Sequence, residues 1–334
     1  MFDILISMPS PPRILLPDTV VFVTTRTWRD IPFVPTRTMN TILRGIFARA
    51  QFLYPVILSA AKMMGNHLHL IIRVKDPEVV AQFMDRIKTE SAHAVNCMLG
   101  RRNCPVWEDG YDSLPILTIE DVIKKFIYLY TNAQAANLED TIDAYPGLSS
   151  WQCFLDDRTT IDCPWIRRSK IPRLPSSQLS DRQDLFLVST IIRTNKISHN
   201  LKFDHFGWLD CFQIEPETRE AVKKKIIDGV RNTEEKLRKD RQIKSISVLG
   251  AEALKRRPMD KPFTTQKFAR RMWCICSDVP LRIQFINFIK DLRQRAREVR
   301  TRWKSGDRAA SYPVGLFPPR FPLLANLITR EFLS

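Results

Sequence analysis

The stretch Lys62–Val74, "KMMGNHLHLIIRV", carries two of the five histidines of the chain on one strand-like run. In an extended strand, residues two apart project to the same face, so His67 and His69 point together while Leu68 faces the other way. Two neutral imidazoles on one face, about 7 Å apart by strand rise, can chelate one divalent metal ion. The alternative is a pair of half-buried structural histidines, and each of these would need its own hydrogen-bond partner.

Regular elements on both sides of this stretch predict an α+β fold. "LHLIIRV" is rich in β-branched residues and leucine, and "YPVILSAAKMM" before it is typical of a partner strand. The expected order is strand 19–27, helix 38–54, strands 54–61 and 67–74, helix 77–99, a hairpin returning through 113–118, and helix 118–138. Thr118 is the expected N-cap of the last helix, with Asp121 in a capping-box position. Helices interleaved with a few strands favour an antiparallel sheet with helices packed against it.

The composition sets limits on the class of protein. With 334 residues and 44% apolar content, the chain can form one large or two modest domains. It has no run of eighteen apolar residues, so no membrane span is expected, and its N-terminus does not read as a signal peptide. The seven cysteines are scattered without a C-x-x-C pair, which is typical of reduced thiols in a cytosolic protein.

The charge is distributed unevenly along the chain. Residues 1–150 contain 15 Lys+Arg and 15 Asp+Glu, whereas residues 151–334 contain 37 and 21, so the whole net charge of +16 lies in the second half. Such an asymmetry indicates a polyanionic partner, most simply nucleic acid, although a solvated basic surface is the alternative. We expect a proline-rich arm over 1–17, a folded domain over 18–151, and a mainly α-helical basic extension over 152–334. The extension should begin with a Pro/Ser-rich linker at 167–183 and contain long helices within 216–243 and 279–307.

The predicted helix 118–138 carries Tyr128 and Asn132, which lie four residues apart and therefore on one face. If that face meets the two histidines, Asn132 can offer its carbonyl oxygen to a metal ion and Tyr128 can present its phenol beside it. Tyr130 lies off this face and is expected to pack in the core.

Several segments of this sequence resemble one family. His67-Leu68-His69 resembles the histidine–hydrophobe–histidine (HUH) motif of single-strand DNA nucleases. "MMGNHLHLIIRV" resembles the "MPNHxHLLV" strand of single-tyrosine transposases, especially the REP-associated group. "VWEDGYDSLPILTIEDVIKKFIYLYTNAQAANLED" is similar to their segment that ends in Tyr-x-x-x-Asn-Pro-x-x-Ala-Gly, and "AYPGLSSW" is similar to their closing "YPWSS". The resemblance covers about residues 18–151. Gly65, Ala133 and Asn137 depart from the family pattern, at two prolines and one glycine.

The resemblance implies an HUH, ferredoxin-like core with a single-stranded DNA endonuclease and strand-transferase activity. It places Tyr128 on the nucleophile that forms a 5′-phosphotyrosine, and His67, His69 and Asn132 on the ligands of Mg²⁺ or Mn²⁺. It also implies single-stranded or hairpin DNA as the partner, no membrane, and a cytoplasmic, nucleoid-associated protein. A homodimer is compatible with it, because dimeric relatives exchange the tyrosine helix between subunits.

Further residues are candidates for DNA contact: Arg86, Lys88, Trp107, Tyr111, Arg293, Arg297 and Arg300. The two aromatic residues can stack on unpaired bases, or they can pack in the core. The cationic residues can contact phosphate, or they can form the solvated faces of their helices. Two other functions share the same core. One is a replication or conjugation initiator, which more often has a third histidine ligand, and the other is a DNA-binding protein that does not cut.

Overall fold

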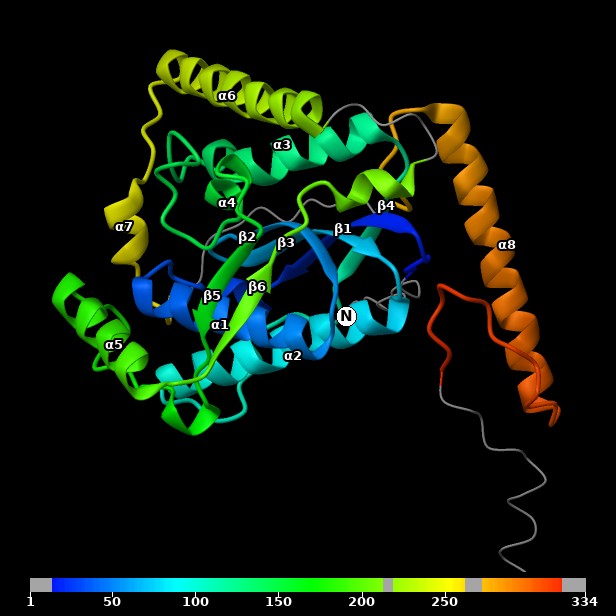
Figure 1. The fold of residues 1–334 in the computed structure, drawn as a ribbon, viewed down its shortest axis with the longest axis horizontal. Helices are drawn as coiled ribbons and strands as arrows, with labels where there is room; N and C mark the ends of the chain where they lie inside the picture. The colour runs from blue at the N-terminus through cyan, green and yellow to red at the C-terminus, as the bar shows by residue number, and fades with distance from the viewer. Residues whose placement is uncertain (1–13, 213–218, 262–271, 320–334) are drawn as a thin grey trace, which may run out of the picture.

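The computed structural model describes residues 14–212, 219–261 and 272–319. Its centre is a four-stranded antiparallel sheet in the order β2-β3-β1-β4 (Figure 1). The strands are β1 (Thr19–Arg26), β2 (Ile57–Met63), β3 (His67–Val74) and β4 (Asp112–Ile116). The first two helices are α1 (Arg37–Leu53) and α2 (Pro77–Met98). The sequence β1-α1-β2-β3-α2-β4 with this strand order is the split βαβ arrangement of ferredoxin-like folds. The predicted α+β class is confirmed.

Strand alternation divides the core between the two faces of the sheet. On β3, Leu68, Leu70 and Ile72 pack toward α1 and α2 in one apolar cluster. Ile71, and Phe22 of β1, pack in a second cluster with α3 (Ile119–Ala135) and α6 (Arg219–Ile243). The sheet is therefore covered on both faces, with α3 along one of them (Figure 1). His67 and His69 point to the α3 face, because both contact Asn132 of α3.

The start of α3 is capped as expected. The Asp121 N–H donates to Thr118 Oγ1 at 3.2 Å. The Asp121 carboxylate accepts from the Thr118 hydroxyl at 2.9 Å and from the Ser277 N–H at 2.7 Å. It does not bond the Thr118 backbone, so the reciprocal half of a capping box is replaced by a contact to a residue 156 positions away.

The second half of the chain contains a strand pair that the sequence analysis did not predict. β5 (Thr160–Pro164) and β6 (Ser198–Lys202) pair in antiparallel fashion and pack against α1. The predicted linker 167–183 is too long, because α5 (Asp181–Thr194) begins at Asp181 with a capping box between Ser180 and Gln183.

The remaining elements are η1 (Trp28–Asp30), α4 (Trp151–Leu155), η2 (Arg168–Lys170), η3 (Gly207–Cys211), α7 (Ala251–Lys255) and α8 (Val279–Lys304). Residues 1–13 of the predicted arm and residues 216–218 of the predicted helix 216–243 lie outside the described part.

The second half is joined to the first through shared apolar clusters. Val222, Ile226 and Val230 of α6 are fully buried in the same cluster as Phe126 of α3. The long helix α8 instead stands at one side of the molecule, where its buried residues meet Ile14 and Leu316 (Figure 1). No helix in the described ranges is both long and apolar enough to span a bilayer. Residues on both sides of position 151 thus stabilise α3, whereas α8 is more exposed.

Candidate active site

The histidine pair begins strand β3 and faces α3. His69 is 3% exposed and His67 is partly buried, and their ring centroids lie 4.6 Å apart. The Nδ1 of His67 lies 2.7 Å from the Asn66 Oδ1, and the Nδ1 of His69 lies 3.0 Å from the Thr24 hydroxyl. A carboxamide oxygen only accepts, so His67 Nδ1 carries the proton and its Nε2 keeps a lone pair. The contacts at Nδ1 therefore orient each ring with Nε2 toward α3.

Both Nε2 atoms meet the side chain of Asn132. The Asn132 Nδ2 lies 3.1 Å from His67 Nε2 and 3.0 Å from His69 Nε2. Nitrogen and oxygen of a carboxamide have nearly the same shape, so a half-turn of this group points Oδ1 at the same place. Two imidazole nitrogens and one carboxamide oxygen thus converge, and this donor set suits a borderline or hard divalent cation such as Mn²⁺ or Mg²⁺.

The electrostatic surroundings keep the histidines neutral. Burial, together with the positive charges of Arg26 and Lys62, lowers the pKa of His67 to about 4. Burial first, and then the neighbouring His67, lowers the pKa of His69 well below its usual range. Neutral imidazole is the form that binds a metal ion, so both side chains are ready for ligation at neutral pH. Within the described ranges, no cluster of three His, Cys, Asp or Glu side chains forms an alternative metal site.

Tyr128 lies one helical turn before Asn132 on the same face. Its ring centroid is 5.7 Å from that of His69 and 5.9 Å from that of Phe22, and its side chain is 43% exposed. The Lys125 Nζ lies 4.8 Å from the centre of the Tyr128 ring. Burial raises the pKa of Tyr128, and the positive charge of Arg26 partly offsets this. The phenol is thus protonated at neutral pH, accessible from solvent, and adjacent to the histidine pair.

This geometry lies in a segment with recognisable relatives. Residues 23–130 match the family described as IS200-like transposases. The resemblance expected from the sequence is confirmed over this segment, which contains His67, His69 and Tyr128, while Asn132 lies two residues beyond it. A solved structure of a REP-associated tyrosine transposase bound to a REP hairpin is 18% identical, covers 45% of this chain and 86% of its own, and superposes with a TM-score of 0.38. No curated protein matches the chain.

The other tyrosine of α3, Tyr130, has a different environment. Tyr130 is fully buried, and its hydroxyl lies 3.0 Å from the Ser150 Oγ. Burial raises its pKa far above the usual range. Its ring packs with Phe126, Trp151 and Phe154. The prediction that Tyr130 is a packing residue is confirmed, and Tyr130 makes a natural control for Tyr128.

The sequence analysis missed a buried lysine that connects the sheet to α3. Lys62 of β2 is fully buried, and its Nζ donates to the Tyr130 carbonyl at 2.8 Å. It pairs with His69 in the β2–β3 register, and its Nζ lies 4.9 Å from the centre of the Tyr145 ring. Burial lowers the pKa of Lys62 well below its ordinary value. A lysine inside the apolar run "LSAAKMM" was the available signal, because lysine is rarely buried without a partner.

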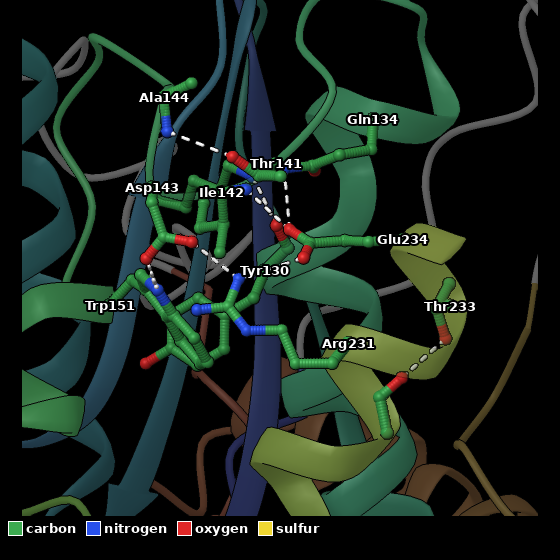
Figure 2. A network of polar contacts seen from close by, with 12 residues as sticks. Tyr130, Gln134, Thr141, Ile142, Asp143, Ala144, Trp151, Arg231, Thr233 and Glu234 are labelled. Atoms are coloured by element: carbon green, nitrogen blue, oxygen red, sulfur yellow. Dashed lines mark hydrogen bonds and ion pairs between the residues drawn. The ribbon is translucent and has the colours of Figure 1, made fainter. Parts of the chain in front are cut away.

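A second missed group holds α3 from the other side (Figure 2). Glu234 of α6 is 3% exposed and accepts from the Ile142 N–H at 2.6 Å and from Gln134 of α3 at 3.4 Å. Arg231 bridges the Glu234 carboxylate at 3.0 Å and the Asp143 carboxylate at 2.5 Å. The network therefore connects α6, the loop after α3, and the helix that carries the candidate tyrosine.

The predicted DNA contacts within residues 86–111 are engaged with the protein itself. Arg86 forms an ion pair with Glu90 at 3.0 Å, and the Lys88 Nζ donates to the Glu108 carbonyl at 2.8 Å. Trp107 is 8% exposed, packs against the ring of Phe33, and donates its indole N–H to Ser91. Tyr111 is half-buried against the same core. Of the two alternatives that the sequence left open for Trp107, the structure shows core packing, because both its ring and its N–H are used in the core.

The predicted arginines of the second half lie on α8. Arg297 and Arg300 are exposed, and the Arg293 guanidinium lies 4.3 Å from the centre of the Trp273 ring. This helix stands at one side of the molecule (Figure 1). The structure thus brings Tyr128, Asn132 and the two histidines together, and leaves the α8 arginines as a separate surface.

Proposed function

We propose that this protein is a metal-dependent single-stranded DNA endonuclease and strand transferase of the transposase type. The observation that carries the proposal is the meeting of His67 Nε2, His69 Nε2 and Asn132 at 3.0–3.1 Å, with Tyr128 on the same face of α3. The family match over residues 23–130 supports a transposase-type activity for this segment. All four side chains come from one chain, so a monomer contains the complete candidate site.

In this reaction, the Tyr128 oxygen attacks the phosphorus of a DNA phosphodiester. An oxygen–phosphorus bond to the tyrosine forms, and the bond from phosphorus to the 3′ oxygen breaks. The phenol gives up its proton, and the departing 3′ oxygen takes one up as a hydroxyl. The phosphodiester energy is kept in the 5′-phosphotyrosine, so a 3′-hydroxyl of another strand can reverse the reaction and join to it.

The residues around Tyr128 serve this chemistry in separate ways. His67, His69 and Asn132 would hold the metal ion, which when bound polarises the scissile phosphate oxygens. The Lys125 ammonium, 4.8 Å from the Tyr128 ring centre, would stabilise the negative charge that develops on the phenol oxygen during attack. The charge of Arg26, which opposes the effect of burial on the Tyr128 pKa, acts in the same direction.

We propose single-stranded or hairpin-tipped DNA as the substrate. The net charge of +16 in residues 151–334 supports a polyanionic partner, and Arg297 and Arg300 on α8 are exposed for phosphate contact. Deleting residues 152–334 would not measure that contribution, because Val222, Ile226 and Val230 of α6 complete the core around α3. Point substitutions on α8 separate DNA affinity from folding.

The test is a denaturing gel of the protein with labelled random-sequence single-stranded DNA and Mn²⁺. The wild type should give a covalent protein–DNA band, Tyr128→Phe should give none, and the matched control Tyr130→Phe should keep it. The reverse pattern for the two tyrosines would contradict the assignment. Cleavage that persists undiminished in EDTA would rule out the metal site.

A further inference from the structure

A pocket of about 630 Å³ opens beside the first turns of α3. Its lining from the first half is Asp121, Lys124 and Lys125 of α3, and its lining from the second half is residues 272–277 with Arg282 and Ile286 of α8. Neither the sequence analysis nor the proposed active site accounts for this pocket. It combines elements from both halves of the chain.

The wall from the second half is fixed to the sheet. Ile275 forms a parallel bridge with Ile116 of β4, its N–H donates to the Pro115 carbonyl at 2.8 Å, and its carbonyl accepts from the Leu117 N–H at 3.1 Å. Ser277 donates its N–H to the buried Asp121 carboxylate at 2.7 Å. Main-chain pairing at the sheet edge and a cap contact at α3 therefore position residues 272–277 before any ligand arrives.

The lining has the chemistry that binds an unpaired nucleotide. Trp273 is 36% exposed, and the Arg293 guanidinium stacks at 4.3 Å from its ring centre. Three cationic side chains line the cavity, against the single carboxylate of Asp121. That carboxylate is 2% exposed and already accepts bonds from Ser277, Thr118 and Lys124. An aromatic ring for base stacking, set among cations for phosphate, is how proteins bind single strands without reading sequence.

The position of the pocket links it to the candidate active site. Lys125 lines the pocket, and its Nζ lies 4.8 Å from the Tyr128 ring centre. Lys125 and Tyr128 are three residues apart, which corresponds to about 4.5 Å along a helix axis. We propose that the pocket binds one unpaired nucleotide of the DNA strand adjacent to the phosphate that Tyr128 attacks. The base stacks on Trp273, and Lys124 and Arg282 contact the backbone phosphates. The placement of this nucleotide next to the attacked phosphate rests on the proposed function.

The test measures binding without cleavage, in the full-length Tyr128→Phe protein with EDTA present. Two fluorescein-labelled probes of equal charge are compared by anisotropy, namely a strand of twelve thymidines and a strand of twelve abasic sites. We expect the thymidine strand to bind more tightly, by about tenfold, the size expected for one base stacked on an aromatic ring. Adding Trp273→Ala should remove this preference and leave the affinity for the abasic strand unchanged.

The matched control is Phe186→Ala, since Phe186 is 65% exposed on α5, at the opposite side of the molecule from α8 (Figure 1). It should keep the preference. A preference that survives Trp273→Ala, or that is absent from the parent protein, would overturn the proposal.

A second measurement does not depend on how Trp273→Ala folds. A strand containing 5-iododeoxyuridine, crosslinked to the Tyr128→Phe protein, should label peptides that contain residues 121–125 or 272–282. Crosslinks confined to other peptides would also overturn the proposal. If the protein prefers the thymidine strand but the wild type never forms the covalent adduct, the proposed nuclease function is wrong and the nucleotide pocket stands. If the wild type forms the adduct but the preference is absent, the pocket proposal is wrong and the nuclease function stands.

Discussion

Replacing Glu234 by alanine tests whether α6 holds the tyrosine helix in place. The substitution removes a carboxylate that is 3% exposed and that accepts from the Ile142 N–H at 2.6 Å. Ile142 is itself 3% exposed, so its N–H is left buried without this acceptor, at a cost of about 1–3 kcal/mol. Arg231 also loses one of its two carboxylate partners, but its side chain is 41% exposed, so the lost ion pair adds only about 0.2–1 kcal/mol. Arg231 keeps its ion pair with Asp143, so we expect the free energy of unfolding to fall by about 2–3 kcal/mol in total.

Two further variants sharpen this prediction. Glu234→Gln keeps an oxygen for the Ile142 N–H and should lose less stability, about 1–2 kcal/mol. Glu235→Ala removes the next residue along α6, which is exposed and paired only at the surface with Lys239, and should leave stability unchanged. The free energy of unfolding is measured by urea titration with circular dichroism, and all three variants are compared at one pH.

The same variants report on function. Glu234→Ala should lower the yield of covalent adduct at 25 °C, although it leaves Tyr128 and the histidines unchanged, because α3 loses a contact through Gln134. Glu235→Ala should not lower it. If Glu234→Ala unfolds within roughly 0.5 kcal/mol of the wild type, the range expected of an ordinary surface change, then the network does not stabilise α3 and the reasoning is refuted.

Three further predictions concern single groups. In EDTA, the pKa of His67 is about 4 in the folded protein and about 6.5 in the unfolded chain. Between pH 6.5 and pH 4 the unfolded chain therefore takes up a proton that the folded protein does not. The free energy of unfolding should for this reason fall by about 2 kcal/mol from pH 7 to pH 5. A urea titration at both pH values should show this fall reduced in His67→Gln, and an equal fall would contradict the assignment. Tyr130→Phe should lose about 1 kcal/mol through its bond to Ser150 while still forming the adduct, as checked by urea unfolding and a denaturing gel. The double variant Arg297→Gln with Arg300→Gln should weaken DNA binding and lower the slope of log K against log salt by roughly 1.4; an unchanged slope would mean that these arginines do not contact phosphate.

Local sequence patterns predicted the elements that carry the candidate site. The alternation in "HLHLIIRV" placed His67 and His69 on one face of a strand, and the four-residue spacing placed Tyr128 and Asn132 on one face of a helix. These patterns work because side-chain direction repeats every two residues in a strand and every 3.6 in a helix. They show which residues point together, and the resemblance to transposases supplied the expectation that the two faces meet.

Other residues of the site could not be placed from the sequence. Glu234 follows Val222, Ile226 and Val230 at four-residue steps, so it lies on the apolar row of α6, but nothing local shows that its partner is the Ile142 N–H. From the sequence, Trp107 was a candidate for base stacking or for the core, and the structure buries it, while Trp273 remains exposed. The two environments differ because Phe33 and Ser91 cover Trp107, and both come from other elements.

The sequence by itself determined the strand, the helix and the direction of the four candidate side chains, because these depend on the repeat of the backbone within one element. Only the tertiary structure decided that Asn132 bonds both Nε2 atoms, that Lys62 and Glu234 hold α3 from two sides, and that Ile275 extends the sheet beside β4. Each of these contacts joins residues more than sixty positions apart. Such pairs form only when burial of apolar surface from several elements brings them together, and no periodicity within one element specifies the partner.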